Sequence, residues 1–213
     1  MTEKIKVRII GYGNLGRGAE LAIKQQRDME LVAVFSRRGK VDTFDEQIPS
    51  YHIDEVEKFT DKIDVMILCG GSATDLPEQT PHFSTMFNTV DSYDTHAKIP
   101  EHFAAVNEAA EKAGKVSVIS VGWDPGLFSI NRVMAEAVLA EGNTYTFWGK
   151  GLSQGHSDAV RRVEGVKNGV QYTLPSETAM DRVRNGENPD LATAEKHKRE
   201  CYVVLEDGAS ADE

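Results

Sequence analysis

The sequence has 213 residues, of which 40% are hydrophobic and 27% are charged, and its 34 acidic and 24 basic side chains give a net charge of −10. These values are typical of a globular chain with a sizeable core, and they exclude disordered, fibrous and disulfide-stapled classes. The acidic balance also makes a nucleic-acid backbone a poor partner, although a local basic pocket can still exist.

Strand-like and helix-like segments alternate through the first half of the chain. Short runs of β-branched residues predict strands at residues 6–10, 31–35, 64–69, 89–91 and 116–120. Helical spacing of apolar residues predicts helices at 14–26 and 100–113, the second followed by Gly114 at its stop position. Strands that alternate with helices form βαβ units, so we expect a doubly wound, Rossmann-like α/β domain with a parallel sheet over residues 1–120.

The pattern changes after residue 120, where strands outnumber helices and the loops lengthen. We expect a helix at 126–141, strands at 144–148, 170–174 and 201–205, and a polar helix at 176–184. Residues 121–213 are therefore predicted to form a second, mixed α+β domain. The last strand lies close to residue 213 and ought to need a partner.

The strongest local motif is Gly11-Tyr12-Gly13-Asn14-Leu15-Gly16, which directly follows the first strand and opens the first helix. In this context Gly11 permits a tight turn, Gly13 lets the backbone approach a pyrophosphate, and Gly16 allows close helix–strand packing. A glycine-rich turn that serves packing alone is the alternative. The position between strand and helix favours a dinucleotide-binding loop.

Ser36-Arg37-Arg38 follows the second strand, where an NAD-selective site usually places a carboxylate for the ribose 2′-hydroxyl. Two guanidinium groups would instead attract a 2′-phosphate. A solvated basic loop is the alternative, and the position favours NADP. Cys69-Gly70-Gly71-Ser72 ends the third strand at the rim where ligands of such sheets bind, and Cys69 is better explained as a buried thiol than as a nucleophile.

Two carboxylates fall just past the ends of the fourth and fifth strands. Asp94 ends the run 91–94, and Asp124 lies in the middle of the run 122–126. We expect both at the rim beside the nicotinamide, where they could hold a substrate ammonium and one could act as a general base. Spacing alone also allows an N-cap or turn role for Asp94 and a turn role for Asp124.

Along essentially its whole length, the sequence resembles the meso-diaminopimelate dehydrogenase family. The matching stretches occur in order at residues 11–17, 35–38, 71–75, 90–94, 122–126, 128–133, 146–149, 151–159, 171–177 and 197–201. The resemblance implies a reversible, NADP-dependent oxidative deamination of meso-2,6-diaminopimelate at its D-configured carbon, in lysine and diaminopimelate biosynthesis. The implied products are L-2-amino-6-oxopimelate and ammonia.

The resemblance also implies roles for single residues. Asp94 and Asp124 would contact the reacting ammonium, and Asp124 would handle the proton. Among the implied substrate contacts, Trp148 walls the site, Gln154 and Gly155 line it, and Thr173 and Arg199 hold a carboxylate. The expected cofactor contacts are Gly11, Tyr12, Gly13, Asn14, Leu15, Gly16, Ser36, Arg37, Arg38, Cys69, Gly70, Gly71, Ser72, Ser92, Tyr93, Asp94, Val121, Gly122, Trp123, Asp124 and Pro125.

The resemblance implies that family members continue past residue 213 with further substrate contacts. We therefore expect the second domain to be incomplete at its C-terminus and turnover to be impaired. A homodimer with a small amino-acid substrate is implied, and we expect no metal site, nucleic acid or membrane. Apolar runs are too short to span a bilayer, and two cysteines without a disulfide framework favour a cytoplasmic location. The alternatives are a non-catalytic NADP-binding or oligomerising module, and a related NADP-linked reductase of another aspartate-derived acid.

Overall fold

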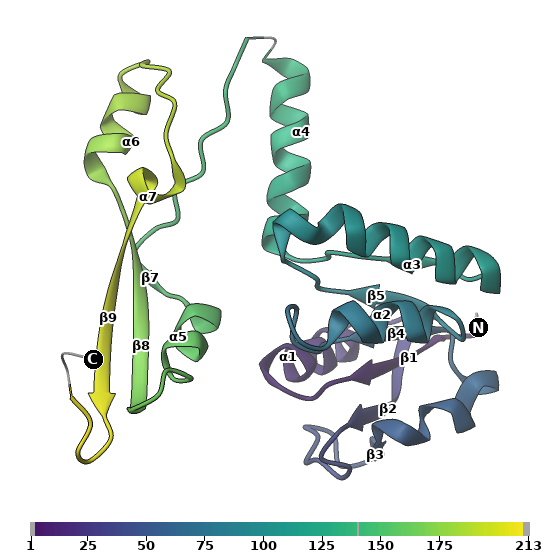
Figure 1. The fold of residues 1–213 in the computed structure, drawn as a ribbon. Coiled ribbons are helices and arrows are strands. Elements are labelled where there is room, and N and C mark those ends of the chain that lie inside the picture. The colour runs from purple at the N-terminus through teal and green to yellow at the C-terminus, as the bar shows by residue number, and fades with distance from the viewer. Residues whose placement is uncertain (1–2, 140, 211–213) are drawn as a thin grey trace. The chain divides into compact units, whose positions relative to one another are not determined.

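The computed structural model describes residues 3–139 and 141–210, without the side chains of residues 61, 62 and 154. The chain forms two compact units, Met1–Met134 and Ala135–Glu213 (Figure 1). Within the described part of the chain, no helix is long and apolar enough to cross a membrane.

The first unit contains a six-stranded sheet in the order β3-β2-β1-β4-β5-β6. Its strands are β1 (Ile5–Ile10), β2 (Met29–Ser36), β3 (Ser50–His52), β4 (Val65–Leu68), β5 (Asn88–Asp91) and β6 (Ser117–Val118), and all neighbours are parallel. The strand order reverses between β1 and β4, and ligands of such sheets bind outside the carboxyl ends at this point. The predicted doubly wound parallel sheet is confirmed.

Helical segments connect these strands. They are α1 (Asn14–Lys24), η1 (Ile53–Lys62), α2 (Leu76–Ser84), η2 (His96–Lys98) and α3 (Ile99–Ala113), followed by η3 (Trp123–Leu127) and α4 (Phe128–Val138). As the sequence predicts, α3 ends at Gly114, whose φ of 63° is left-handed. The sequence analysis did not predict β3, η1, α2 or η2.

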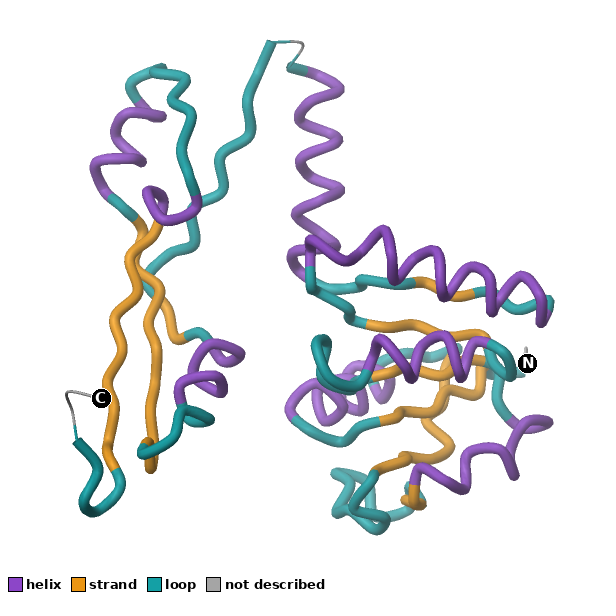
Figure 2. The backbone as a smooth tube through the Cα atoms, in the orientation of Figure 1, coloured by secondary structure: helices purple, strands orange, loops and turns teal. Residues whose placement is uncertain are grey.

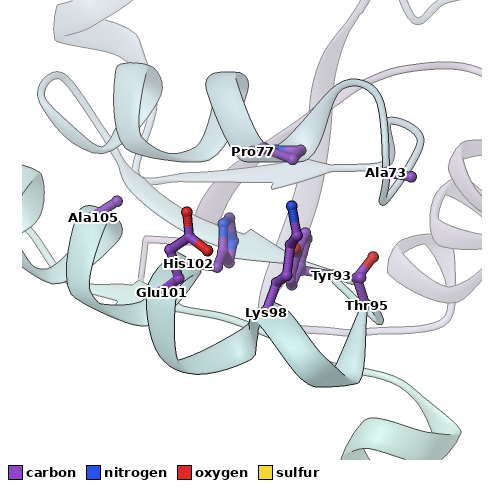
Figure 3. A pocket seen from close by; sticks show the side chains of 8 residues that line it. All are labelled: Ala73, Pro77, Tyr93, Thr95, Lys98, Glu101, His102 and Ala105. Atoms are coloured by element: carbon purple, nitrogen blue, oxygen red, sulfur yellow. The ribbon is translucent and has the colours of Figure 1, made fainter.

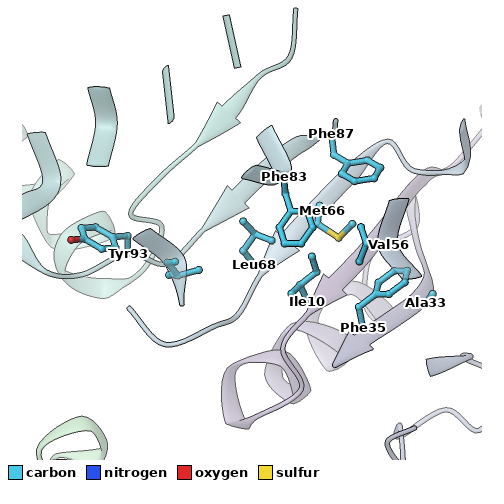
Figure 4. Packing of buried hydrophobic residues seen from close by; sticks show 10 residues of the cluster. Ile10, Ala33, Phe35, Val56, Met66, Leu68, Phe83, Phe87 and Tyr93 are labelled. Atoms are coloured by element: carbon cyan, nitrogen blue, oxygen red, sulfur yellow. The ribbon is translucent and has the colours of Figure 1, made fainter. Parts of the chain in front are cut away.

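Apolar side chains bury both faces of the sheet. Ile10 of β1 belongs to one buried cluster, together with Phe83 of α2 (Figure 4). Its neighbour Ile9 belongs to a second cluster, together with Ile23 of α1. Because successive side chains of a strand point to opposite faces, α2 covers one face of the sheet and α1 covers the other. This two-sided burial explains the continuous apolar run of β1.

The second unit contains a three-stranded antiparallel sheet in the order β7-β8-β9. Its elements are β7 (Gly151–Leu152), α5 (Gln154–Val160), β8 (Val166–Pro175), α6 (Glu177–Arg184), α7 (Thr193–Lys196) and β9 (His197–Leu205). The long strands β8 and β9 run side by side (Figure 2). Strands and helices are mixed, which confirms the predicted α+β character.

One predicted element is wrong, because residues 144–148 form no strand. Tyr145 Oη lies 2.7 Å from Asn188 Oδ1 and 2.8 Å from the carbonyl oxygen of Pro189, and the N–H of Trp148 donates to His197 Nε2 at 2.7 Å. These tertiary contacts replace the ladder that local β propensity predicts. Conversely, α5 forms where the sequence predicts only a loop.

Candidate functional site

The glycine-rich loop between β1 and α1 packs tightly against the end of β4. Gly11 has a left-handed φ of 88°, and a Cβ there would lie 2.9 Å from the carbonyl oxygen of Cys69. A Cβ on Gly16 would lie 2.1 Å from the carbonyl oxygen of Gly11, whereas a Cβ on Gly13 would have no atom within 4 Å. The fold therefore requires glycine at positions 11 and 16. Gly13 instead leaves open space at the start of α1, where helix N–H groups bind anions.

A cavity of ≈ 290 Å³ opens at this loop. Its lining unites three predicted stretches that are far apart in the sequence, residues 11–13, 36–38 and 69–71. The lining is completed by Ile10, Ile53, Asp75 and Gln79. This place, at the carboxyl ends of β1, β2 and β4, is where doubly wound sheets bind dinucleotides.

Two arginines and one carboxylate, Asp75, line this cavity. Arg38 Nη2 donates to the carbonyl oxygen of Tyr12 at 2.9 Å, which holds the guanidinium over the glycine-rich loop. Arg37 is 71% exposed at its side chain and pairs with Asp75, with 3.1 Å between Nη1 and Oδ1. Guanidinium groups placed in this way suit a phosphate, because they stay charged and present several donors.

Tyr12 fixes the glycine-rich loop to the rest of the unit. Its hydroxyl donates to Oε2 of the buried Glu20, whose Oε1 accepts the N–H of Asp45 at 2.9 Å. Burial, together with the hydrogen bond to Glu20, raises the pKa of Tyr12 to about 12. The loop is thus joined both to α1 and to the segment that follows Arg38.

Cys69 lies at the end of β4, with its carbonyl group against Gly11. Burial raises the pKa of its thiol to about 12. The thiolate is the nucleophilic form of cysteine, and a thiol with this pKa remains protonated at neutral pH. The structure therefore supports the interpretation of Cys69 as a packed thiol.

Asp94 lies in the loop after β5 with an exposed side chain. Its N–H donates to Ser72 Oγ at 2.8 Å, and this hydroxyl lies 3.4 Å from Thr95 Oγ1. The bond connects the loop after β5 to the loop after β4. Ser72 and Asp94, both expected at the site from sequence, are thus in direct contact.

Asp124 pairs with Arg132 of α4. Arg132 Nη1 donates to Oδ1 at 2.8 Å and Nη2 donates to Oδ2 at 2.6 Å, and the carboxylate is 13% exposed. These hydrogen bonds lower the pKa of Asp124 from its ordinary value of 3.8, with smaller contributions from the charges of Arg132 and His96. The side chain is therefore ionised at neutral pH.

The remaining predicted cofactor residues lie along the same rim of the first unit. Tyr93 has a buried ring that stacks on His102 at 4.0 Å. With His102 it lines a second cavity of ≈ 380 Å³ between α2 and α3 (Figure 3). The others are Asn14 and Leu15 at the start of α1, Gly70 after β4, Ser92 after β5, and Val121, Gly122, Trp123 and Pro125 before α4.

The expected substrate-contact residues fall in the second unit. Thr173 of β8 and Arg199 of β9 are direct cross-strand partners. A Cβ on Gly169 of β8 would lie 2.5 Å from the side chain of Val160, so Gly169 is on the sheet face that α5 covers. Side chains alternate between the two faces of a strand, and Thr173 is an even number of residues from Gly169. Thr173 is therefore on the same face. Gly155 lies in α5 and is exposed, whereas the side chain of Gln154 lies outside the described residues.

Trp148 is 41% exposed, and its N–H is bound by His197 Nε2 at 2.7 Å. The pKa of His197 is lowered, chiefly by burial and further by Lys196 and Arg199. The imidazole is therefore neutral at physiological pH and can accept this hydrogen bond through Nε2.

The sequence did not predict four residues that contact site residues. Glu20 binds Tyr12, Asp75 binds Arg37, Arg132 binds Asp124, and His197 binds Trp148. Each of the four uses its side chain to form a hydrogen bond or an ion pair with the predicted residue. A weak signal exists for Arg132, which follows Asp124 by eight residues on the next helix, and for Asp75 and His197, which lie within stretches that resemble the family. No local pattern singles out Glu20.

Two family models match the chain in succession. A model described as a CoA binding domain matches residues 2–122, and a model described as the diaminopimelic acid dehydrogenase C-terminal domain matches residues 122–213. Curated relatives are meso-diaminopimelate D-dehydrogenases from Lysinibacillus sphaericus, 71% identical, and Ureibacillus thermosphaericus, 65% identical. Both alignments cover 97% of this chain and 64% of the relative, so the chain spans less than two thirds of their length.

Solved structures agree with these relatives. The diaminopimelate dehydrogenase of Corynebacterium glutamicum in complex with diaminopimelate has a TM-score of 0.90 and 54% identity over 97% of this chain and 63% of that chain. An engineered D-amino acid dehydrogenase bound to NADP+ has a TM-score of 0.87 and 53% identity over 95% of this chain and 63% of that chain. With both units matched in order, the chain belongs to the meso-diaminopimelate dehydrogenase family.

Proposed function

We propose that this chain belongs to an NADP-dependent dehydrogenase that deaminates meso-2,6-diaminopimelate at its D-configured carbon to L-2-amino-6-oxopimelate and ammonia, reversibly. Residues 1–120 would be its dinucleotide-binding domain, and residues 121–213 part of its substrate-binding and dimerisation domain. The observation that carries the proposal is the cavity that unites the glycine-rich loop with Arg37 and Arg38. It lies in a chain 71% identical to a meso-diaminopimelate D-dehydrogenase.

The described residues fit NADP. Gly13 leaves room for a pyrophosphate at the start of α1. Ser36 ends β2, and Arg37 and Arg38 follow it where an NAD-selective site has a carboxylate. Bound NADP would accept the hydride that leaves the D-configured carbon. The arginines would hold its 2′-phosphate, and backbone N–H groups of the loop would hold its pyrophosphate.

Asp94 and Asp124 are proposed to hold the reacting ammonium. Both belong to loops at the carboxyl ends of neighbouring strands, which is the rim where substrates of such sheets meet the cofactor. The pairing with Arg132 keeps Asp124 ionised, which suits the binding of a cation. Each oxygen of Asp124 accepts one hydrogen bond from Arg132 and keeps a second acceptor site, through which it would take a proton, as the family resemblance implies.

In the second unit, Trp148, Gln154, Gly155, Thr173 and Arg199 are proposed to bind the rest of the substrate. The cross-strand pairing of Thr173 with Arg199 supports this, because directly opposed residues project their side chains from the same face of the sheet. Together these groups can orient a carboxylate through a charge-assisted fork. Diaminopimelate carries two carboxylates, and one of them would bind here.

A homodimer and a cytoplasmic location complete the proposal. Cys69 and Cys201 are both free thiols, which suits a reducing compartment. The dimer rests on the family resemblance, and light scattering on the purified chain at several concentrations tests it. A mass equal to one chain at all concentrations would contradict the dimer.

An assay that follows the absorbance of the reduced nicotinamide, with separate diaminopimelate isomers, tests the proposed reaction. We expect NADP reduction and ammonia release with the meso isomer, and negligible reduction with the LL isomer. NADP binding by a folded chain without turnover would favour a non-catalytic NADP-binding module. Turnover of another amino acid alone would favour a related reductase.

A further inference from the structure

Asp91, the last residue of β5, carries a fully buried carboxylate that accepts four hydrogen bonds. Oδ2 accepts from Thr80 Oγ1 at 2.8 Å and from His102 Nε2 at 2.7 Å. Oδ1 accepts from the backbone N–H of Tyr93 at 3.0 Å and from that of Ser120 at 2.8 Å. A buried charge is tolerated only when it is satisfied in this way, so the group is held firmly in one place.

The two backbone donors lie in the loops that carry the proposed ammonium-binding carboxylates. Tyr93 directly precedes Asp94, and Ser120 begins the segment that leads to Asp124 four residues later. A single side chain therefore binds the backbone of both loops. Hydrogen bonds from N–H groups to a carboxylate are stronger than those to neutral acceptors, so this connection is a stiff one.

Ser120 supplies an independent sign that this connection imposes a conformation. Its φ of 60° lies in the left-handed region, where a non-glycine residue is strained. Its N–H bonds to Asp91 Oδ1, and the next N–H, of Val121, bonds to the carbonyl oxygen of Asp91 at 2.9 Å. The contacts with Asp91 thus hold the chain in a bend that it would otherwise avoid.

His102 holds Asp91 from the side of α3. Its side chain is 3% exposed, and its ring stacks on that of Tyr93 with an interplanar angle of 19°. Figure 3 shows both rings among the residues that line the cavity between α2 and α3. His102 therefore contacts Asp91 by a hydrogen bond and the loop after β5 by stacking.

We propose that Asp91, oriented by His102, is a positioning residue that sets the places of Asp94 and Asp124. Its effect on turnover rests on the proposed dehydrogenase function, whereas its effect on the two loops does not. A displacement of about 1 Å in a catalytic group can cost about 100-fold in rate. Neither Asp91 nor His102 has to touch the substrate to have such an effect.

The first test measures amide hydrogen exchange in the full 213-residue chain. Asp91→Asn keeps the shape of the side chain, and its oxygen can still accept from both N–H groups, but the bonds lose their charge. We expect the amides of Tyr93 and Ser120 to exchange about tenfold faster, while amides of β1 keep their rates. Unchanged exchange at Tyr93 and Ser120 would overturn the proposal.

The second test separates positioning from folding and from cofactor binding. His102→Phe retains the ring against Tyr93 but removes the hydrogen bond to Asp91. We expect kcat with meso-diaminopimelate to fall about 10- to 100-fold. The compound 2′,5′-ADP probes only the cavity at Arg37 and Arg38, and we expect its dissociation constant to change less than about twofold. His102→Gln, whose amide can donate to Asp91, should restore part of the loss.

His82→Phe is the matched control, because His82 is an exposed histidine of α2, and wild-type kcat is expected for it. Wild-type kcat in His102→Phe would overturn the proposal. If the unsubstituted chain shows no turnover, the proposed function fails, and the exchange rates of Asp91→Asn alone decide the positioning role. If His102→Phe does not fold, the kcat and exchange rates of Asp91→Asn decide it.

Discussion

Arg132 and Asp124 form a bidentate ion pair, with Nη1 2.8 Å from Oδ1 and Nη2 2.6 Å from Oδ2. The pair connects η3 to α4 and occupies both oxygens of a carboxylate that we propose to meet the substrate ammonium. Parallel N–H···O bonds of this kind set the orientation of the carboxylate as well as its charge. Each oxygen keeps a second acceptor site, so Asp124 can bind the substrate ammonium while it remains paired with Arg132.

Removal of Arg132 should make stability depend differently on pH. The pKa of Asp124 is lowered in the folded chain, so its pairing stabilises the fold above the ordinary carboxyl pKa of 3.8 and is lost as the pH falls through the lowered value. Arg132→Met should therefore be less stable than the unsubstituted chain at neutral pH in urea unfolding. The deficit should shrink as the pH falls towards about 2.

Arg184→Met is the control for this experiment. Arg184 pairs with Asp181 at 3.3 Å, and both side chains are more than 60% exposed. Exposed pairs of this kind contribute about 0–1 kcal/mol, so the variant should unfold almost like the unsubstituted chain at every pH. A deficit in Arg132→Met that stays constant with pH would show that the pair does not titrate as proposed.

Two glycines of the same loop should respond differently to alanine. At Gly16 a Cβ would collide with the carbonyl oxygen of Gly11, so Gly16→Ala should lose about 1–3 kcal/mol of unfolding free energy. At Gly13 a Cβ meets open space and φ is −94°, so Gly13→Ala should fold normally. It should nevertheless bind NADP at least about tenfold more weakly, because the methyl group takes the place of a phosphate. Thermal unfolding and calorimetric titration measure the two effects, and normal NADP affinity in Gly13→Ala would contradict the proposed site.

Replacement of both Arg37 and Arg38 by alanine should raise the KM for NADP far more than that for NAD. Hydrogen bonds to charged groups are worth about 1.5–3 kcal/mol each, so the loss should be at least about tenfold for NADP. Initial-rate kinetics with each nucleotide measure the difference. Arg27→Ala, at an exposed arginine after α1, should leave both constants unchanged. Equal effects of the double substitution on NADP and NAD would contradict the proposed 2′-phosphate site.

The two cysteines should differ in reactivity. Burial raises the pKa of Cys69 to about 12, so this thiol should stay unmodified by iodoacetamide at mildly alkaline pH. Cys201 is exposed on β9 and should react. Mass spectrometry of the folded chain should therefore find one adduct, at Cys201. Rapid alkylation of Cys69 without unfolding would refute the role of a packed thiol.

Much of the first unit was predictable because its signals are local. The motif at residues 11–16 lies between a strand and a helix, and these neighbours determine what its glycines do. Gly114 ends α3 for an equally local reason, namely its left-handed φ. The strand expected at 144–148 failed because side chains distant in sequence bind that segment.

The sequence by itself determined the doubly wound fold, the dinucleotide loop and the arginine pair after β2, since periodicity and motif context specify these within a few residues. Only the tertiary structure decided which groups bind these features: Arg132 for Asp124, Asp75 for Arg37, and Asp91 for the backbone of both carboxylate loops. Arg132 is eight residues from Asp124 in the sequence, and Asp75 is 38 residues from Arg37. Asp91 binds backbone N–H groups, which every residue except proline has, so no sequence pattern indicates this contact. Their pairing depends on angles and distances of a few ångströms, and these exist only once the sheet has brought its strand ends together.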